Sequence, residues 1–196
     1  MHFRREKTAG IRGHSLSIPN LVTLVRILLV PIVVWAITSG EMRIAFLLFV
    51  AAGVSDAIDG FVAKRFHMTS ELGAYLDPLA DKALIVSIYV SLGIAGKLPL
   101  FLVILVVSRD IMIIGAFMLA WLVGKPMAAR PLMVSKINTV AQILLATLVL
   151  AEQGFGFDAD LSSRLLMALV AVLTLLSIAF YLVEWVRHMN SFGGNH

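Results

Sequence analysis

The amino-acid sequence predicts an all-α, polytopic membrane protein with six transmembrane helices and a short N-terminal interfacial segment. The chain has 196 residues, of which 60% are hydrophobic and only 14% are charged. Its mean hydropathy of +0.95 lies well above the range of soluble domains. Apolar stretches close to the ~20 residues that cross a bilayer recur along nearly the whole chain. There is therefore no room for a separate soluble domain, and any chemistry belongs to the helices and their connections.

The first three predicted spans lie at 21–37, 44–63 and 72–95. The first opens after Pro19 and Asn20, residue types that suit the first turn and the cap of a helix. Its Arg26 lies deep enough to need a carboxylate or lipid phosphate as partner, unless its side chain reaches back to the membrane surface. The second and third spans carry two aspartates each, and the polar residues between them suit a short turn. We expect these two helices to be antiparallel neighbours.

The other predicted spans lie at 98–123, 132–151 and 165–186. Arg109 and Asp110 fall in the middle third of the first of these. Adjacent helical residues point about 100° apart, so we expect this pair to bind neighbouring helices rather than each other. A break containing Pro126 and Pro131 precedes the next span, and the segment 152–163 before the last span is predicted to be a solvated turn, because it lacks the ligand set of a calcium loop.

Residues 1–17 form a basic arm that contains Arg4, Arg5, Lys7 and Arg12. It has no apolar core followed by a small-residue cleavage site, so we interpret it as an interfacial segment rather than a cleaved signal peptide. Residues 18–188 form the membrane domain, and 189–196 are expected to be a flexible tail. No nucleic-acid partner is expected.

Basic residues are distributed unequally between the two sides of the predicted membrane domain. One side carries the N-terminal arm, Lys64, Arg65, Lys125, Arg130, Lys136 and Arg187, whereas the other side carries Arg43, Lys97 and Arg164. By the positive-inside rule both termini are cytoplasmic, as are the ends of the second and third spans. We therefore expect an integral protein of a bacterial inner membrane, with its active site on the cytoplasmic side.

Four aspartates inside this apolar chain are the main indication of function. They are Asp56, Asp59, Asp77 and Asp81. A carboxylate at membrane depth costs on the order of 2.5–3.5 kcal/mol, so four of them need compensation, most simply by bound cations. The spacing within each pair, i to i+3 and i to i+4, places its members on one helical face. Two facing pairs of carboxylates predict a site for hard divalent cations.

The residue types around these aspartates favour phosphoryl transfer. Oxygen ligands favour magnesium, manganese or calcium, and the absence of cysteine excludes thiolate sites. Gly60 and Gly73 leave the backbone uncovered, so a nucleotide can approach closely. Two cations can clamp a diphosphate, and a carboxylate of the cluster can take the proton of an attacking hydroxyl.

A small cation or proton transporter is the alternative, but its carboxylates would be expected near the bilayer midplane at a repeat interface. A catalytically inactive scaffold is disfavoured because all four aspartates are present.

The segment from Asp56 to Asp81 resembles the signature of the CDP-alcohol phosphotransferase family. The matching residues are Asp56, Asp59, Gly60, Ala63, Gly73, Asp77 and Asp81, with Lys64 where the family usually has arginine. The resemblance extends to the residues 18–23 and to the six-span layout. It implies a transferase that uses CDP-diacylglycerol and releases CMP, with two divalent cations, Mg²⁺ or Mn²⁺. Similar proteins are commonly homodimers.

The resemblance also implies roles for individual residues. Asp56 and Asp77 would bridge both cations, Asp59 would hold one and Asp81 the other, and Asp81 would be the general base. The residues implied in donor binding are Asn20, Thr23, Gly60, Lys64, Ser70 and Gly73. The candidates for acceptor binding are Arg109, Arg130 and Lys136.

The acceptor alcohol is predicted from features that separate two branches of the family. The branch that uses glycerol 3-phosphate often has a second arginine where this chain has Phe117. A free phosphate needs charge-assisted hydrogen bonds, so the missing cation disfavours that acceptor. The stretches 76–82, 108–110 and 131–139 are similar to the branch that forms cardiolipin from phosphatidylglycerol. We therefore expect phosphatidylglycerol as acceptor, with glycerol 3-phosphate as the alternative.

Overall fold

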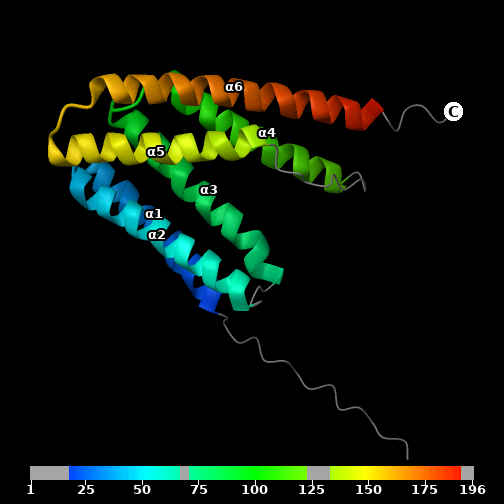
Figure 1. Ribbon diagram of the computed structural model, residues 1–196, viewed down its shortest axis with the longest axis horizontal. Coiled ribbons are helices and arrows are strands. Elements are labelled where there is room, and N and C mark those ends of the chain that lie inside the picture. The colour runs from blue at the N-terminus through cyan, green and yellow to red at the C-terminus, as the bar shows by residue number, and fades with distance from the viewer. Residues whose placement is uncertain (1–17, 67–70, 123–132, 191–196) are drawn as a thin grey trace, which may run out of the picture.

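The computed structural model confirms an all-α architecture. It describes the backbone of residues 18–66, 71–122 and 133–190, and the side chains of 24–58, 82–115 and 133–185. Within these ranges it has six helices, shown in Figure 1: α1 (Ile18–Thr38), α2 (Met42–Phe66), α3 (Glu71–Ile94), α4 (Leu100–Leu122), α5 (Met133–Phe155) and α6 (Asp160–Asn190). Each predicted span corresponds to one helix. The predicted arm at 1–17 lies outside the described residues.

The predicted turn at 152–163 is wrong in its extent, because both of its ends are helical. α5 continues to Phe155 and α6 begins at Asp160, which leaves only 156–159 as the connection. Two polar contacts explain this. The Ser163 hydroxyl donates to Glu152 Oε2 at 2.8 Å, which joins the two helix ends, and Asp158 Oδ1 accepts the backbone N–H of Asp160 at 3.0 Å, which caps α6.

Two helices of the described part are long and apolar enough to cross a membrane, namely Met133–Phe155 and Asp160–Trp185. The distribution of side chains also fits a lipid environment. Large apolar side chains such as Leu28, Ile104 and Leu169 face outward, whereas several charged and amide side chains, including Arg109 and Asn138, are buried. Helix packing through buried polar groups is typical of membrane proteins, whose lipid-facing surface is apolar.

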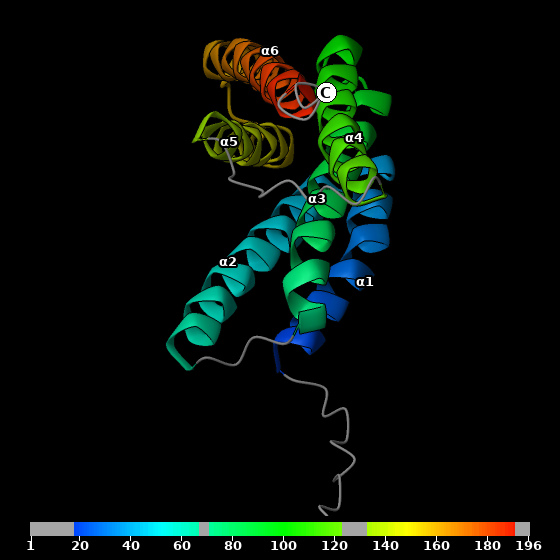
Figure 2. The ribbon, with the colours of Figure 1, turned by 90° about the vertical axis from the view of Figure 1, so that its right-hand side faces the viewer.

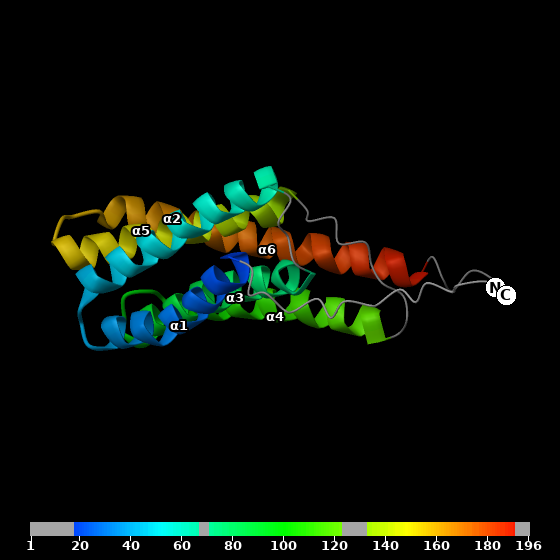
Figure 3. The same cartoon turned by 90° about the horizontal axis from the view of Figure 1, so that it is seen from below.

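The helices form one bundle in which α1 to α4 run obliquely to α5 and α6 (Figures 1 and 2). α1 packs against α2 and α3, α5 packs against α6 and α2, and α4 packs against α6 and α3. The three short connections that join α1 to α2, α3 to α4 and α5 to α6 gather at one end of the bundle (Figure 3). The ends of α2 and α3 that carry the acidic motif lie at the opposite end.

Two of the short connections stop a helix in the same way. Gly40 after α1 and Gly96 after α3 have φ angles of 80° and 68°. In both, the next residue donates its backbone N–H back across the last turn, from Glu41 to Ala36 O and from Lys97 to Leu92 O, each at 2.8 Å. These left-handed glycines satisfy carbonyls that the helix end would otherwise leave unpaired, and they turn the chain sharply into the next helix.

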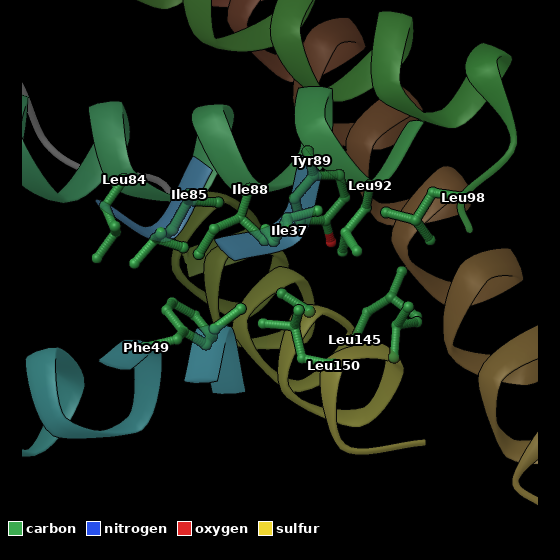
Figure 4. Packing of buried hydrophobic residues seen from close by; sticks show 14 of the residues in the cluster. Ile37, Phe49, Leu84, Ile85, Ile88, Tyr89, Leu92, Leu98, Leu145 and Leu150 are labelled. Carbon is green, nitrogen blue, oxygen red and sulfur yellow. The ribbon is translucent and has the colours of Figure 1, made fainter. Parts of the chain in front are cut away.

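The core is centred on one face of α3. Leu84, Ile85, Ile88, Tyr89 and Leu92 are buried there, and Figure 4 shows them packed against side chains of α1, α2 and α5. Tyr89 adds a polar link, because its hydroxyl donates to the carbonyl oxygen of Gln142 in α5 at 3.1 Å. This packing holds α3 in the middle of the bundle.

Gly93 is expected to be essential for the packing of α3 on α4. A Cβ at this position would lie 2.9 Å from Val103 Cγ2, and the β-branched Val103 side chain has few alternative rotamers. We expect Gly93→Ala to destabilise the protein by about 1–3 kcal/mol. Thermal unfolding in detergent measures this effect. Gly115→Ala is the matched control, since nothing lies within 4 Å of its added Cβ; a loss of stability as large in this control would contradict the steric explanation.

Candidate functional site

The structure places the four aspartates on two consecutive antiparallel helices. Asp56 and Asp59 lie on α2 and Asp77 and Asp81 lie on α3, as the spacing predicts. α2 ends at Phe66 and α3 begins at Glu71, so the connection between them is short. Asp56 is the one of the four whose side chain lies in the described part. The roles of the four aspartates as metal ligands and of Asp81 as base remain predictions.

Asp56 pairs with Arg26 of α1. Arg26 Nη2 donates to Asp56 Oδ1 at 2.5 Å, and the Arg26 side chain is 5% exposed whereas that of Asp56 is 46% exposed. The expectation that Arg26 needs a carboxylate or phosphate partner is therefore confirmed with a carboxylate. Because the Asp56 carboxylate is half exposed, it can accept further ligands on its open side.

A cavity of about 420 Å³ lies beside this ion pair. Arg26 and Asp56 form its polar part. Its other walls come from α2, α3 and α5 and are mostly apolar: Phe49, Val50, Ala52, Gly53, Val54, Ala57, Leu84, Ile85, Thr139, Ile143 and Thr147. A cavity with one charged end and long apolar walls suits a ligand that is itself charged at one end and apolar along its length.

The helical register relates this cavity to the remaining aspartates. On α3, positions 77 and 81 precede Leu84 and Ile85 by one to two turns at spacings that share one helical face. On α2, position 59 follows Asp56 by three residues and shares its face in the same way. By register, the helical positions of the aspartates thus continue the faces that line the cavity. We therefore expect the acidic motif to lie next to the end of the cavity near Asp56.

The described donor groups fit hard cations. The cavity wall carries the carboxylate of Asp56, and the chain has no cysteine. Oxygen donors of this kind favour Mg²⁺ or Mn²⁺. Among the side chains that the structure describes, no group of three histidine, aspartate or glutamate residues is close enough to hold a metal ion. Asp59, Asp77 and Asp81 lie outside that set.

A second polar cluster lies between α3, α4, α5 and α6. Lys82 Nζ donates to Asp110 Oδ1 at 2.8 Å, and Arg109 Nη1 donates to the same oxygen at 2.6 Å. Arg109 also donates through Nε to Ser177 Oγ at 3.2 Å and through Nη2 to Ser135 Oγ. The prediction that Arg109 and Asp110 pair with neighbouring helices rather than with each other is therefore partly wrong. The long arginine side chain folds back to its neighbour while also binding two other helices.

The three candidate acceptor-binding residues differ in their surroundings. Arg109 is fully buried, and each of its guanidinium nitrogens contacts a protein partner. Lys136 at the start of α5 is exposed. Arg130 lies outside the described residues. To bind an acceptor, Arg109 would have to exchange one of its protein contacts for the ligand, so the predicted acceptor role fits Lys136 better.

Sequence reasoning assigned no role to Lys82, which the structure places in the buried cluster. The signal that could have identified it is its position, because an ionisable residue at membrane depth needs a partner and Lys82 directly follows Asp81.

The predicted donor-binding residues Asn20 and Thr23 lie on α1, Gly60 and Lys64 on α2, and Gly73 on α3. Ser70 lies outside the described residues, and these donor roles remain predictions.

Comparison with known proteins identifies relatives over most of the chain. Residues 16–182 match the family described as CDP-alcohol phosphatidyltransferase. Human cardiolipin synthase (CMP-forming) is 33% identical over 190 residues, which cover 89% of this chain and 63% of the relative. A chloroplastic CDP-diacylglycerol–glycerol-3-phosphate 3-phosphatidyltransferase 1 of Oryza sativa is 34% identical over 170 residues, 78% of this chain and 52% of the relative. A Schizosaccharomyces pombe cardiolipin synthase (CMP-forming)/mitochondrial hydrolase fusion protein is 30% identical over 191 residues, 89% of this chain and 32% of the relative. The chain thus spans about a third to two thirds of the length of these relatives.

Proposed function

Because this chain belongs to the CDP-alcohol phosphatidyltransferase family, we propose that it transfers the phosphatidyl group of CDP-diacylglycerol to a glycerol hydroxyl of phosphatidylglycerol, which forms cardiolipin and CMP. The observation that carries the proposal is the cavity beside Asp56 and Arg26. By helical register its walls lie on the faces of α2 and α3 that continue to positions 59, 77 and 81, which supports a mostly apolar space next to the acidic motif. Proteins of this family are integral membrane proteins and are generally metal-dependent.

In the proposed reaction Asp81 accepts the proton of the acceptor hydroxyl. The hydroxyl oxygen then forms a bond to the phosphorus that carries the diacylglycerol, and the bond from that phosphorus to the oxygen it shares with cytidine monophosphate breaks. CMP leaves with that oxygen, and Asp81 releases its proton to solvent. A carboxylate within hydrogen-bond reach of the attacking hydroxyl contributes about 10²–10⁴-fold to the rate of such a step.

Asp56, Asp59, Asp77 and Asp81 would hold two Mg²⁺ or Mn²⁺ ions. When bound, these ions supply positive charge that neutralises the diphosphate and polarises its phosphorus. Asn20, Thr23, Gly60, Lys64, Ser70 and Gly73 would bind the cytidine diphosphate. Arg26 holds Asp56 at the edge of the cavity, which supports a defined position for this carboxylate before any cation binds.

The apolar walls of the cavity support a lipid as acceptor. Phosphatidylglycerol has acyl chains that can lie along apolar side chains such as Val50 and Ile143, while its terminal glycerol reaches the acidic motif. A free glycerol 3-phosphate needs several charge-assisted hydrogen bonds. Among the described residues of the cavity wall, Arg26 carries positive charge, and it is already paired with Asp56. These residues therefore give less support to a free phosphate than to a lipid.

The second candidate is a phosphatidylglycerophosphate synthase that uses glycerol 3-phosphate. The 34% identity to the Oryza sativa enzyme favours it, because that relative is named for this acceptor. Exposed Lys136, together with Arg130, would then bind the acceptor phosphate. A transporter is disfavoured by membership of a family of transferases.

We further propose that all six helices span the membrane, with both termini and the active site on the cytoplasmic side of a bacterial inner membrane. The distribution of basic residues supports this orientation. A homodimer is proposed from the family resemblance, and the bilayer itself supplies both lipid substrates.

An assay with separated acceptors tests the proposed function. Purified protein with CDP-diacylglycerol and Mg²⁺ is offered phosphatidylglycerol in one reaction and glycerol 3-phosphate in another, and products are identified by mass spectrometry. We expect cardiolipin and CMP from the first reaction only, and no product after EDTA removes the cation. Phosphatidylglycerophosphate from the second reaction alone would establish the second candidate, and no product from either would reject both.

A further inference from the structure

We propose that Lys82 and Asp110 are positioning residues for the divalent cation site, because their ion pair determines the rotation of α3 about its own axis. The inference rests on the proposed function, since it takes Asp77 and Asp81 of α3 as cation ligands. The two positioning residues would contact neither substrate nor cation. They would act by fixing the direction in which the acidic face of α3 points.

The pair belongs to a cluster that joins α3 to three other helices. Lys82 Nζ lies 2.8 Å from Asp110 Oδ1 on α4, and the Asp110 side chain is only 4% exposed. Asp110 is itself held by Arg109, which contacts Ser135 on α5 and Ser177 on α6. Lys82 therefore links α3 to a buried network of polar side chains on α4, α5 and α6.

The spacing between α2 and α3, which carry the four aspartates, depends on the other helices that each of them contacts. α1 packs against both α2 and α3, but in the described part of the chain α2 and α3 make no direct backbone contact with each other. α2 is held by Arg26 and by α5, whereas α3 is held by α1, α4 and α5. We therefore expect the other neighbours of α2 and α3 to orient these helices where the two share a cation site.

The geometry of a helix makes this orientation sensitive to Lys82. Position 82 follows position 81 directly, so the two point about 100° apart, and holding Lys82 toward α4 restricts the direction of position 81. A rotation of α3 by about 10° moves a side-chain tip that lies about 5 Å from the helix axis by roughly 1 Å. Metal–ligand distances tolerate only about 0.2 Å. A small rotation would therefore be enough to weaken cation binding.

The apolar contacts of α3 are less suited to this task. Hydrophobic burial is non-directional, whereas an ion pair in a buried setting requires a particular partner at a particular position. Fixing the register of one helix against another is the best-attested use of such buried polar groups. Burying these charged groups costs desolvation free energy, so a gain in stability alone does not explain why the cluster is present.

Binding of Mn²⁺ to the purified full-length protein tests the proposal independently of catalysis. Free Mn²⁺ is quantified by electron paramagnetic resonance, and competition by Mg²⁺ checks the site. We expect Lys82→Met to weaken Mn²⁺ binding about 10-fold or more, the loss typical of groups that orient metal ligands. Lys82→Arg keeps the charge and is expected to retain most of the affinity.

Tyr89→Phe is the matched control on the same helix. It removes the 3.1 Å hydrogen bond from α3 to the Gln142 carbonyl without touching the cluster. We expect it to lower thermal stability but to leave Mn²⁺ affinity within about twofold of the wild type, since it lies outside the groups that orient metal ligands. If Lys82→Met does not fold, Asp110→Glu is used in its place. This variant keeps every charge but lengthens the carboxylate side chain by one methylene, and a severalfold loss of Mn²⁺ affinity is expected.

Two results would overturn the inference: wild-type Mn²⁺ affinity in Lys82→Met or in Asp110→Glu, or an equal loss of affinity in Tyr89→Phe. Failure of the proposed function is distinguishable from both. A wild-type protein that binds no Mn²⁺, or that binds it but transfers no phosphatidyl group to either acceptor, would reject the proposed function itself. Normal transfer by the wild type together with unchanged affinity in Lys82→Met and Asp110→Glu would reject only the positioning role.

Discussion

Asp81→Asn is expected to reduce phosphatidyl transfer by about 10²–10⁴-fold while largely sparing donor binding. The substitution removes the proposed proton acceptor and replaces a charged cation ligand by a neutral one of the same shape. The donor is held mainly by other residues of the motif, so its binding should change little. Turnover of CDP-diacylglycerol at saturating Mg²⁺ measures the first effect, and the stabilisation of the protein by CDP-diacylglycerol in thermal unfolding measures the second.

Asp158→Asn is the control for this substitution. Asp158 is an exposed acid at the opposite end of the bundle, and its Oδ1 caps the backbone N–H of Asp160, which an asparagine oxygen can also do. Turnover in this variant should equal that of the wild type. Unchanged turnover in Asp81→Asn would exclude Asp81 as the base, and a loss of donor stabilisation equal to the loss of turnover would indicate a role in binding instead.

Asp110→Ala is expected to cause the largest loss of stability, about 3–5 kcal/mol. Its Oδ1 accepts from both Lys82 and Arg109, and the Arg109 side chain is fully buried. Removing the carboxylate leaves two cations without their shared partner in an apolar setting, and a buried charge without compensation is costly. Thermal or denaturant-induced unfolding in detergent, followed by circular dichroism, measures the change.

Arg164→Ala provides the matched control, because it breaks an ion pair at the surface. Arg164 and Asp160 are 74% and 62% exposed and lie one turn apart on α6. Such i,i+4 pairs contribute about 0.3–0.5 kcal/mol. A loss in Asp110→Ala no larger than in this control would mean that water or lipid headgroups reach the cluster and compensate its charges.

Much of the helical layout could be predicted from the chain because hydropathy and helix length are local properties. The predicted spans and the observed helices agree to within a few residues at most ends, and the placement of two aspartates on each of α2 and α3 follows from i to i+3 and i to i+4 spacing. The error at 152–163 arose from composition. Its glycines and acids are typical of a turn, but a hydrogen bond from Ser163 to Glu152 joins the helix ends and allows both helices to continue.

The partners of the buried charges could not be predicted in the same way. Arg26 was expected to need an anion, but its pairing with Asp56 depends on how α1 packs against α2. Arg109 and Asp110 were expected to point apart, which holds for their backbone positions and fails for a side chain as long as arginine. Lys82 has no distinctive local pattern, and its link to Asp110 appears only when α3 and α4 are placed side by side.

The sequence by itself determined the family, the all-α membrane architecture and the acidic motif, because apolar length and the spacing of ligand-type residues are properties of neighbouring residues in the chain. Only the tertiary structure decided that Arg26 holds Asp56 beside a cavity between α2, α3 and α5, and that Lys82 attaches α3 to a buried network of three further helices. These contacts join residues that are separated by 26 to 68 positions in the chain, and hydropathy carries no information about which charged groups packing brings together.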